Sequence, residues 1–229
     1  MALFAIGDLH LSLGTEKPMD VFSGWENYVE LLKTNWLSTV TDEDTVVIPG
    51  DFSWAMKLSE TQKDFAFLAS LPGKKILLRG NHDYWWTSVT KNRNFLAEQG
   101  ISGIDFIQND YIPYENTALC GTRGWFFDSA EAFSEKVAAR EAIRLELSLQ
   151  AAEKDGYAEK IVFLHFPPLN KVHHCDDLIA LMEKYGVKEC CYGHLHGYAI
   201  GGAYLGPRDG IDYQLVSADF LKFMPKKIR

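Results

Sequence analysis

Cysteine is scarce in this sequence of 229 residues, which contains only Cys120, Cys175, Cys190 and Cys191. Their spacing does not match a disulfide framework. The adjacent Cys190 and Cys191 would point to opposite faces of a strand, so buried thiols are the simplest interpretation. We therefore expect a protein of a reducing compartment rather than a small disulfide-linked secreted domain.

Long apolar runs are absent as well. No hydrophobic segment approaches the roughly 20 residues that a helix needs to cross a bilayer. The sequence also lacks repeats, low-complexity segments and a basic leader. We expect a cytoplasmic protein with no membrane partner.

Positive charge is outnumbered by negative charge. Lys and Arg number 23 against 31 Asp and Glu, which gives a net charge of −8. This balance opposes binding of a long polyanion, so nucleic acid is not an expected partner, although a local cluster of cations could reverse the sign at one site. The hydrophobic fraction of 47% suits one generous core, and we expect a single domain over residues 1–229.

Short apolar runs alternate with helical patterns in the first part of the chain. This alternation predicts parallel strands joined by helices up to residue 83, whereas β-prone pieces close together at 103–125 predict antiparallel hairpins. The fold class is therefore α/β with mixed sheets. Helices are predicted at 25–40, at 60–71 after a cap at Ser59, and at 87–99, 129–155 and 176–185.

The last part of the chain is predicted to form a hairpin followed by a short tail. Segments 198–205 and 211–216 alternate in polarity around turn residues and predict a terminal hairpin. The basic tail, residues 226–229, is expected to be a frayed terminus.

Five of the predicted strands end in residues that bind metals or transfer protons. The strand ends are Gly7-Asp8-Leu9-His10, Gly50-Asp51, Gly80-Asn81-His82-Asp83, His165 and Gly193-His194-Leu195-His196. Taken alone, Gly80-Asn81-His82-Asp83 is equally compatible with a polar turn that caps the next helix. Because the carboxyl ends of neighbouring strands in an open α/β sheet meet at one crevice, however, seven potential ligands are expected to converge. They are Asp8, His10, Asp51, Asn81, His165, His194 and His196.

Three side-chain oxygens and four imidazoles are too many for one ion that keeps open positions, but they suit two divalent ions sharing a carboxylate. Mixed oxygen and nitrogen ligands favour Mn, with Fe or Zn as alternatives, over Mg or Ca. Such a pair activates water and clamps phosphoryl oxygens, so phosphate ester hydrolysis is the expected reaction.

The same motifs, in this order, resemble the calcineurin-like metallophosphoesterase family over residues 7–196. The resemblance implies a four-layer α-β-β-α sandwich with two mixed β-sheets. It assigns one metal to Asp8, His10, Asp51 and His196, and the other to Asp51, Asn81, His165 and His194. Asp51 would then bridge the two ions.

The resemblance also implies the catalytic groups. A metal-bridging hydroxide would be the nucleophile, and His82 would protonate the leaving oxygen while Asp83 orients the ring, which agrees with general acid logic. Protein Ser/Thr phosphatases of the family follow the second motif with Asp-Arg-Gly, whereas Phe52-Ser53-Trp54 stand here. This departure argues against a protein phosphatase and leaves small phosphate mono- or diesters as substrates. A non-catalytic scaffold of the same fold and a nuclease remain alternatives.

Several other residues have two interpretations each. Arg123 is flanked by glycines and either binds phosphate or lies in a surface turn. Trp54, Tyr84, Trp85 and Trp86 either line a stacking pocket or belong to the core. His173 and His174 could flank the site, and the loop at 11–23 is a candidate lid or substrate-contacting segment.

Overall fold

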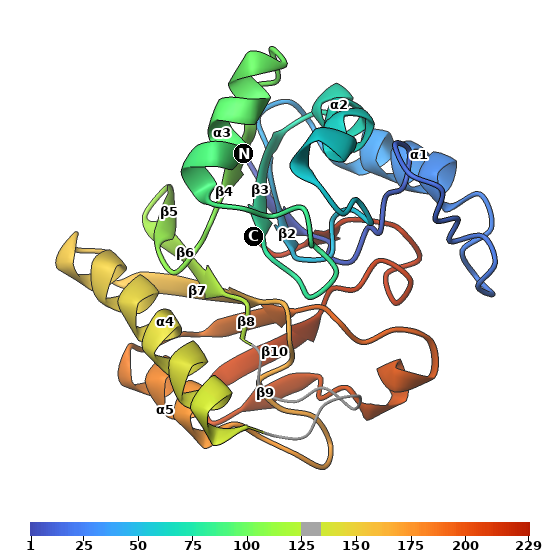
Figure 1. Cartoon of the computed structure of the whole chain (residues 1–229). Coiled ribbons are helices and arrows are strands. Elements are labelled where there is room, and N and C mark those ends of the chain that lie inside the picture. The colour runs from blue at the N-terminus through green and yellow to red at the C-terminus, as the bar shows by residue number, and fades with distance from the viewer. Residues whose placement is uncertain (125–133) are drawn as a thin grey trace.

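The fold is an α/β sandwich of four layers, with two mixed sheets between two layers of helices (Figure 1). It comes from a computed structural model that describes residues 1–124 and 134–229. The expected sandwich is thereby confirmed. No helix in the described part of the chain is long and apolar enough to cross a membrane.

The first sheet has the strand order β11-β1-β2-β3-β4. Its strands are β1 (Leu3–Ala5), β2 (Thr45–Pro49), β3 (Lys74–Leu78), β4 (Ile104–Phe106) and β11 (Lys226–Lys227). Strands β1 to β4 are parallel and β11 is antiparallel to β1. The basic tail is therefore an edge strand, and the prediction of a frayed terminus was wrong.

The second sheet has the strand order β5-β6-β7-β8-β10-β9. Its strands are β5 (Tyr111–Tyr114), β6 (Thr117–Thr122), β7 (Glu159–Leu164), β8 (Glu189–Tyr192), β9 (Gly206–Arg208) and β10 (Ile211–Leu215). The four central strands are parallel, and β5 and β9 are antiparallel edges. The hairpin β9-β10 exists, but segment 197–202 is the 3₁₀ helix η2 (Gly197–Gly202) instead of the predicted strand.

Five α-helices cover the outer faces of the sheets in the described residues. They are α1 (Tyr28–Thr39), α2 (Gln62–Ser70), α3 (Val89–Glu98), α4 (Glu135–Lys154) and α5 (Asp176–Lys184). Figure 1 shows α4 and α5 on one side of the molecule and α1 to α3 on the other. The start of the predicted helix at 129–133 lies outside the described residues.

Two helix starts differ from prediction for local reasons. Helix α1 begins at Tyr28 and not at residue 25. Asn27 has a left-handed backbone conformation with φ 54°, and a right-handed α-helix cannot include such a residue. Ser59 is not a cap but lies within the 3₁₀ turn η1 (Leu58–Thr61) that leads into α2.

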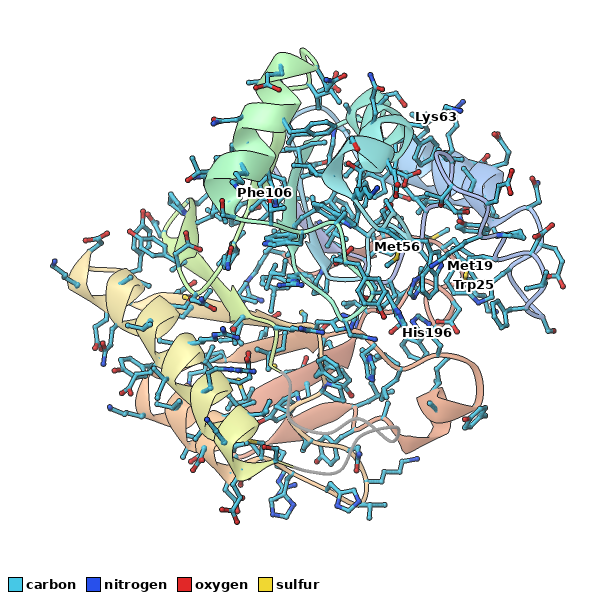
Figure 2. All side chains as sticks on the ribbon, in the orientation of Figure 1. Met19, Trp25, Met56, Lys63, Phe106 and His196 are labelled. Atoms are coloured by element: carbon cyan, nitrogen blue, oxygen red, sulfur yellow. The ribbon has the colours of Figure 1, made fainter. Side chains whose placement is uncertain are left out.

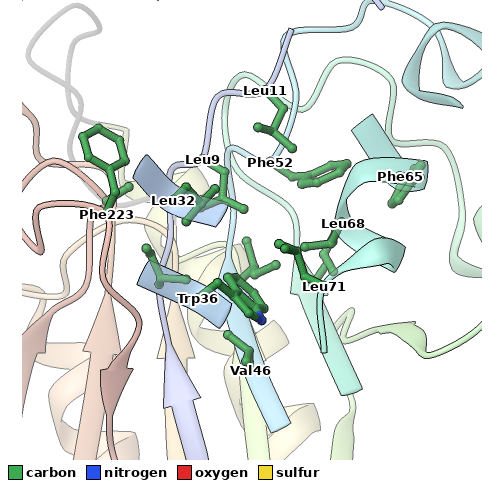
Figure 3. Packing of buried hydrophobic residues seen from close by; sticks show 14 of the residues in the cluster. Leu9, Leu11, Leu32, Trp36, Val46, Phe52, Phe65, Leu68, Leu71 and Phe223 are labelled. Carbon is green, nitrogen blue, oxygen red and sulfur yellow. The ribbon is translucent and has the colours of Figure 1, made fainter. Parts of the chain in front are cut away.

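Successive side chains of a strand point to opposite faces of the sheet, so each strand contributes to two separate parts of the core. Val46 and Ile48 of β2 pack with the first helical layer, while Val47 between them packs between the two sheets. Figure 3 shows Trp36 of α1 packed over Val46 in the first of these clusters. Because both faces of each sheet are covered, every residue of β2 is buried. Rigid parallel strands therefore hold the loops at their carboxyl ends.

Candidate metal centre

The loops after β1, β2, β3, β7 and β8 bring all five predicted motifs to one edge of the sandwich. Asp8, Asp51 and His194 have φ angles of 58°, 51° and 72°, and His10 has 45°. Positive φ is uncommon for residues other than glycine, and such strain concentrates at functional sites. The expected convergence of strand ends is therefore present in the structure.

Two glycines allow the side chains to approach each other. A Cβ atom on Gly80 would overlap the carboxylate and backbone nitrogen of Asp51, and one on Gly193 would overlap the carboxylate of Asp8. Each glycine thus leaves room for a carboxylate from a neighbouring loop.

Asp8, His10 and His196 form a first group of ligand atoms. The Nε2 atoms of His10 and His196 lie 3.3 Å apart, and the His196 Nε2 lies 3.4 Å from an Asp8 oxygen. Ligands at about 2.1 Å from a common ion are separated by roughly 3.0–3.5 Å at tetrahedral or octahedral angles. The spacing in this group fits one divalent cation.

Asp219 orients His196, and the sequence analysis missed it. Its carboxylate lies 3.0 Å from the His196 Nδ1 and accepts a hydrogen bond from the Gly197 amide at 2.9 Å. Burial lowers the pKa of His196, but the charges of Asp8 and Asp219 outweigh this effect and raise it to about 10. Asp219 lies beyond the end of β10 (Ile211–Leu215) without following it directly, so the strand-end argument did not include it.

Asn81, His165 and His194 form a second group. The Asn81 Oδ1 lies 2.6 Å from the His165 Nε2 and 3.1 Å from the His194 Nδ1. On its other side, the His165 Nδ1 lies 3.0 Å from the Pro49 carbonyl oxygen. Because a carbonyl only accepts, we assign the proton to Nδ1, which leaves the Nε2 lone pair directed at the group.

Asp51 lies between the two groups. Its Oδ2 atom is 3.7 Å from the His10 Nε2 and 3.6 Å from the His165 Nε2. Burial raises the pKa of Asp51 well above its usual value, and the charges of Asp83 and Asp8 raise it further.

The burial and the charge of Asp8 and Asp51 indicate whether this site suits metal ions. Asp8 and Asp51 are 0% and 1% exposed, and in the described part of the chain their ion pairs involve only histidines. Buried carboxylates are costly without cations nearby. Imidazoles, which are neutral when they coordinate a metal, and an amide oxygen complete a set of ligands that suits two divalent cations.

Asp83 supports the loops beneath this centre. It accepts hydrogen bonds from the amides of Gly80, Asp51, Phe52 and Ser53 and from the Trp85 indole, all among the described residues. These bonds fix the loops that carry Asp51 and Asn81. That role differs from the one implied by the resemblance, which gave Asp83 to the His82 ring.

His82 lies beside the centre. Its backbone amide donates to the Asp51 Oδ1 at 2.8 Å. Its ring centroid is 4.4 Å from that of Trp54 and 5.6 Å from that of His10. Trp54 also stacks on His10 at 4.9 Å, so it lies next to both histidines.

The other aromatic residues of this region divide between surface and core. Trp85 and Trp86 are buried, at 1% and 4% exposure, and pack in the core near Phe65 and Phe106. Of the two interpretations, the core one therefore applies to these two residues. Tyr84 is half exposed, and its ring lies 6.1 Å from that of His82.

His173 and His174 are exposed on the loop after β7. His174 pairs with Asp176 on the surface at 3.4 Å. Neither residue belongs to the two groups of ligand atoms described above.

Arg123 lies beside the second group instead of in a surface turn. Its guanidinium carbon lies 5.8 Å from the Phe166 ring centroid, and that ring lies 4.1 Å from the His194 ring. Burial lowers the pKa of Arg123 to about 10, with the nearby charge of Arg79 as the second cause. Arg79 directly precedes Gly80, but only the tertiary structure places it near Arg123.

Fold and site together define a class: an α/β sandwich that gathers aspartate, asparagine and histidine side chains at the carboxyl ends of its parallel strands. The sequence profile of the calcineurin-like phosphoesterase family matches residues 1–198. The chain belongs to this family.

Solved structures share the fold at low sequence identity. Phosphopantetheinyl hydrolase from Mycobacterium tuberculosis is 16% identical with a TM-score of 0.55, and the match covers 99% of this chain and 95% of that one. TT1561 of Thermus thermophilus is 15% identical with a TM-score of 0.53, over 85% of this chain and 81% of that one. A comparison with curated proteins by sequence finds no match.

Proposed function

We propose that the protein hydrolyses small phosphate mono- or diesters with two divalent metal ions. One ion would be held by Asp8, His10, Asp51 and His196, and the other by Asp51, Asn81, His165 and His194. Mn is the first choice, with Fe or Zn as alternatives. The observation that carries the proposal is the position of the Asp51 Oδ2, within 3.7 Å of a histidine nitrogen from each group.

The metal ions, when bound, would lower the pKa of a coordinated water and neutralise charge on the phosphoryl oxygens. The other tasks fall to side chains of the chain itself. His82 is anchored through its amide to Asp51 and held against Trp54, which suits protonation of the leaving oxygen. Arg123 lies near enough to Asp51 to interact electrostatically with it, which suits binding of a phosphoryl oxygen.

Local charge supports an anionic substrate despite the net charge of −8. Arg123 lies beside the second group of ligands with the charge of Arg79 close to it, and metal ions would add further positive charge. A compact phosphate ester is favoured over a long nucleic acid, which needs an extended basic groove. This is the reason to prefer the esterase over the nuclease.

The substrate screen should include diesters. A fold relative is a phosphopantetheinyl hydrolase by name, which supports testing phosphodiesters, a phosphopantetheinyl ester among them, beside monoesters. The protein would be assayed with Mn, Fe or Zn on aryl mono- and diesters and on cyclic nucleotides. Elemental analysis in parallel should give about two metal ions per chain.

The variant His82→Ala separates an enzyme from a metal-binding scaffold. We expect turnover to fall at least about 100-fold, the lower range for loss of a general acid, with metal content unchanged. His174→Ala on the exposed loop is the matched control and should keep full activity. Equal activity of the His82 variant would refute the proposed acid, and activity that resists chelators would refute the metal mechanism.

A further inference from the structure

A hollow of about 250 Å³ lies next to the candidate centre. Its lining residues are Lys17, Pro18, Met19, Val21, Phe22 and Trp54. All except Trp54 come from the long loop between β1 and α1. The lining is therefore mostly apolar, and Lys17 is its one charged side chain.

Trp54 connects this hollow to the site. Its indole Nε1 lies 3.1 Å from the Met19 sulfur, and its ring lies 4.4 Å from the ring of His82. Figure 2 labels Met19, Trp25 and His196 in this region, and the Trp25 ring lies 5.8 Å from that of His196. Trp54 therefore borders both the hollow and the ring of His82.

The loop between β1 and α1 exposes large apolar side chains to solvent. Val21 is 71% exposed and Phe22 is 55% exposed. Clustered exposed apolar groups beside a catalytic centre are typical of ligand-binding surfaces. The volume lies a little below the roughly 300 Å³ at which pockets for drug-sized ligands begin, which suits a group of one or two rings.

Lys17 adds a charge preference. Its ammonium lies 5.1 Å from the Trp54 ring centroid and 3.9 Å from the Met56 sulfur. It forms no ion pair with any residue in 1–124 or 134–229. An anionic substituent on the bound group would give it a partner.

We propose that this hollow binds the leaving group of the ester and selects an aromatic leaving group that bears a negative charge at its far end. The inference rests on the proposed function, because it assigns the leaving oxygen to His82. Phe22 and Val21 would contact the ring, and Lys17 would contact the charge. Trp54 would hold the ring beside the acid.

The test compares leaving groups of similar basicity on the metal-loaded full chain. Phenyl phosphate, 2-naphthyl phosphate and 6-sulfonato-2-naphthyl phosphate would be assayed together with their methyl diesters. We expect kcat/KM to rise about 10-fold from phenyl to naphthyl, as for burial of about two methylene groups, and about 3-fold further with the sulfonate, as for an exposed ion pair.

Two variants with matched controls locate the effect. Phe22→Ala should reduce the naphthyl preference to about 3-fold or less, while Leu147→Ala, another half-exposed apolar residue, should keep it. Lys17→Ala should remove only the gain from the sulfonate, while Lys63→Ala on α2 should keep that gain. Thermal unfolding would verify that each variant is folded.

A binding measurement keeps this inference separate from the proposed function. Quenching of tryptophan fluorescence by 6-hydroxynaphthalene-2-sulfonate, without any metal, should report binding that Phe22→Ala weakens. If esters are cleaved with no leaving-group preference and Phe22→Ala changes neither rate nor quenching, the hollow is not a leaving-group site. If no ester is cleaved but the quenching depends on Phe22, the proposed function fails and the ring-binding hollow stands.

Discussion

The Nε2 atoms of His10 and His196 lie 3.3 Å apart, although 186 positions separate the two residues in the chain. His10 follows β1 in the first sheet and His196 follows β8 in the second, so only the packing of the sheets brings them together. Two ring nitrogens at this distance, beside a buried carboxylate, are placed to share a cation.

Metal loading should stabilise the protein. A cation at about 100 times its dissociation constant adds about 2.7 kcal/mol to the free energy of unfolding. Removal of the metals by a chelator should lower the melting temperature, and Mn should restore it. The variant His196→Ala should lose about one of the two metal ions by elemental analysis. Unchanged stoichiometry would contradict the first ligand group.

Asp219 should act as a positioning residue. The variant Asp219→Asn frees the His196 ring from its carboxylate, so metal affinity should fall about 10–100-fold. Competition with a fluorescent chelator measures that affinity. The control is the variant Asp176→Asn. Asp176 pairs with His174 on the surface, so this variant should bind metal as tightly as the parent protein. Equal affinity in both variants would show that the Asp219 contact is incidental.

The metal-free protein should lose stability as pH rises from about 6.5 to about 10. The pKa of His196 is raised from 6.5 to about 10 by Asp8 and Asp219 against the effect of burial, so the folded state holds this proton more tightly than the unfolded state. The stabilisation is complete below about pH 6.5, and its loss has a slope of at most about 1.4 kcal/mol per pH unit. Urea unfolding at several pH values measures it.

The same proton should compete with metal. Coordination needs a neutral imidazole, so apparent metal affinity should rise with pH up to about 10. Asp219→Asn should flatten the pH dependence of stability, because it removes one of the two charges that raise the pKa. A steep dependence retained in that variant would assign the effect to another group.

Arg123 should contribute to phosphate binding. Because its guanidinium is partly desolvated beside the second ligand group, Arg123→Ala should lower kcat/KM roughly 10–100-fold. Arg123→Lys should recover only part of this loss, since an ammonium cannot form a bidentate contact. The control Arg93→Ala removes a surface ion pair with Asp105 and should leave the rate unchanged. A rate for Arg123→Ala equal to that of the control would rule out a contact with the substrate.

Gly193 should tolerate no side chain. In Gly193→Ala the new methyl group would overlap the Asp8 carboxylate, so we expect a loss of about 1–3 kcal/mol in stability and weaker metal binding. Gly201→Ala has open space around the same atom and should remain within about 0.5 kcal/mol of the parent protein. Equal stability of both variants would contradict the close packing of this loop.

Local patterns were sufficient for most of the fold and for the residues that converge. Short apolar runs that alternate with helical patterns predicted the first parallel strands, and the ligands were found because they stand at or just beyond the ends of such runs. Errors fell where a local signal was weak. Segment 197–202 is a 3₁₀ helix, although its neighbours alternate in polarity, and the tail forms β11 because β1 offers it a free edge.

The sequence by itself determined which side chains stand at the strand ends, because the register of a strand and the turn after it depend on neighbouring residues. The tertiary structure decided what surrounds them. It placed Asp219 behind His196, set Arg79 beside Arg123, buried Trp85 and left Trp54 at the site. These relationships depend on how two sheets pack face to face, and no local pattern encodes the distance between residues on different sheets.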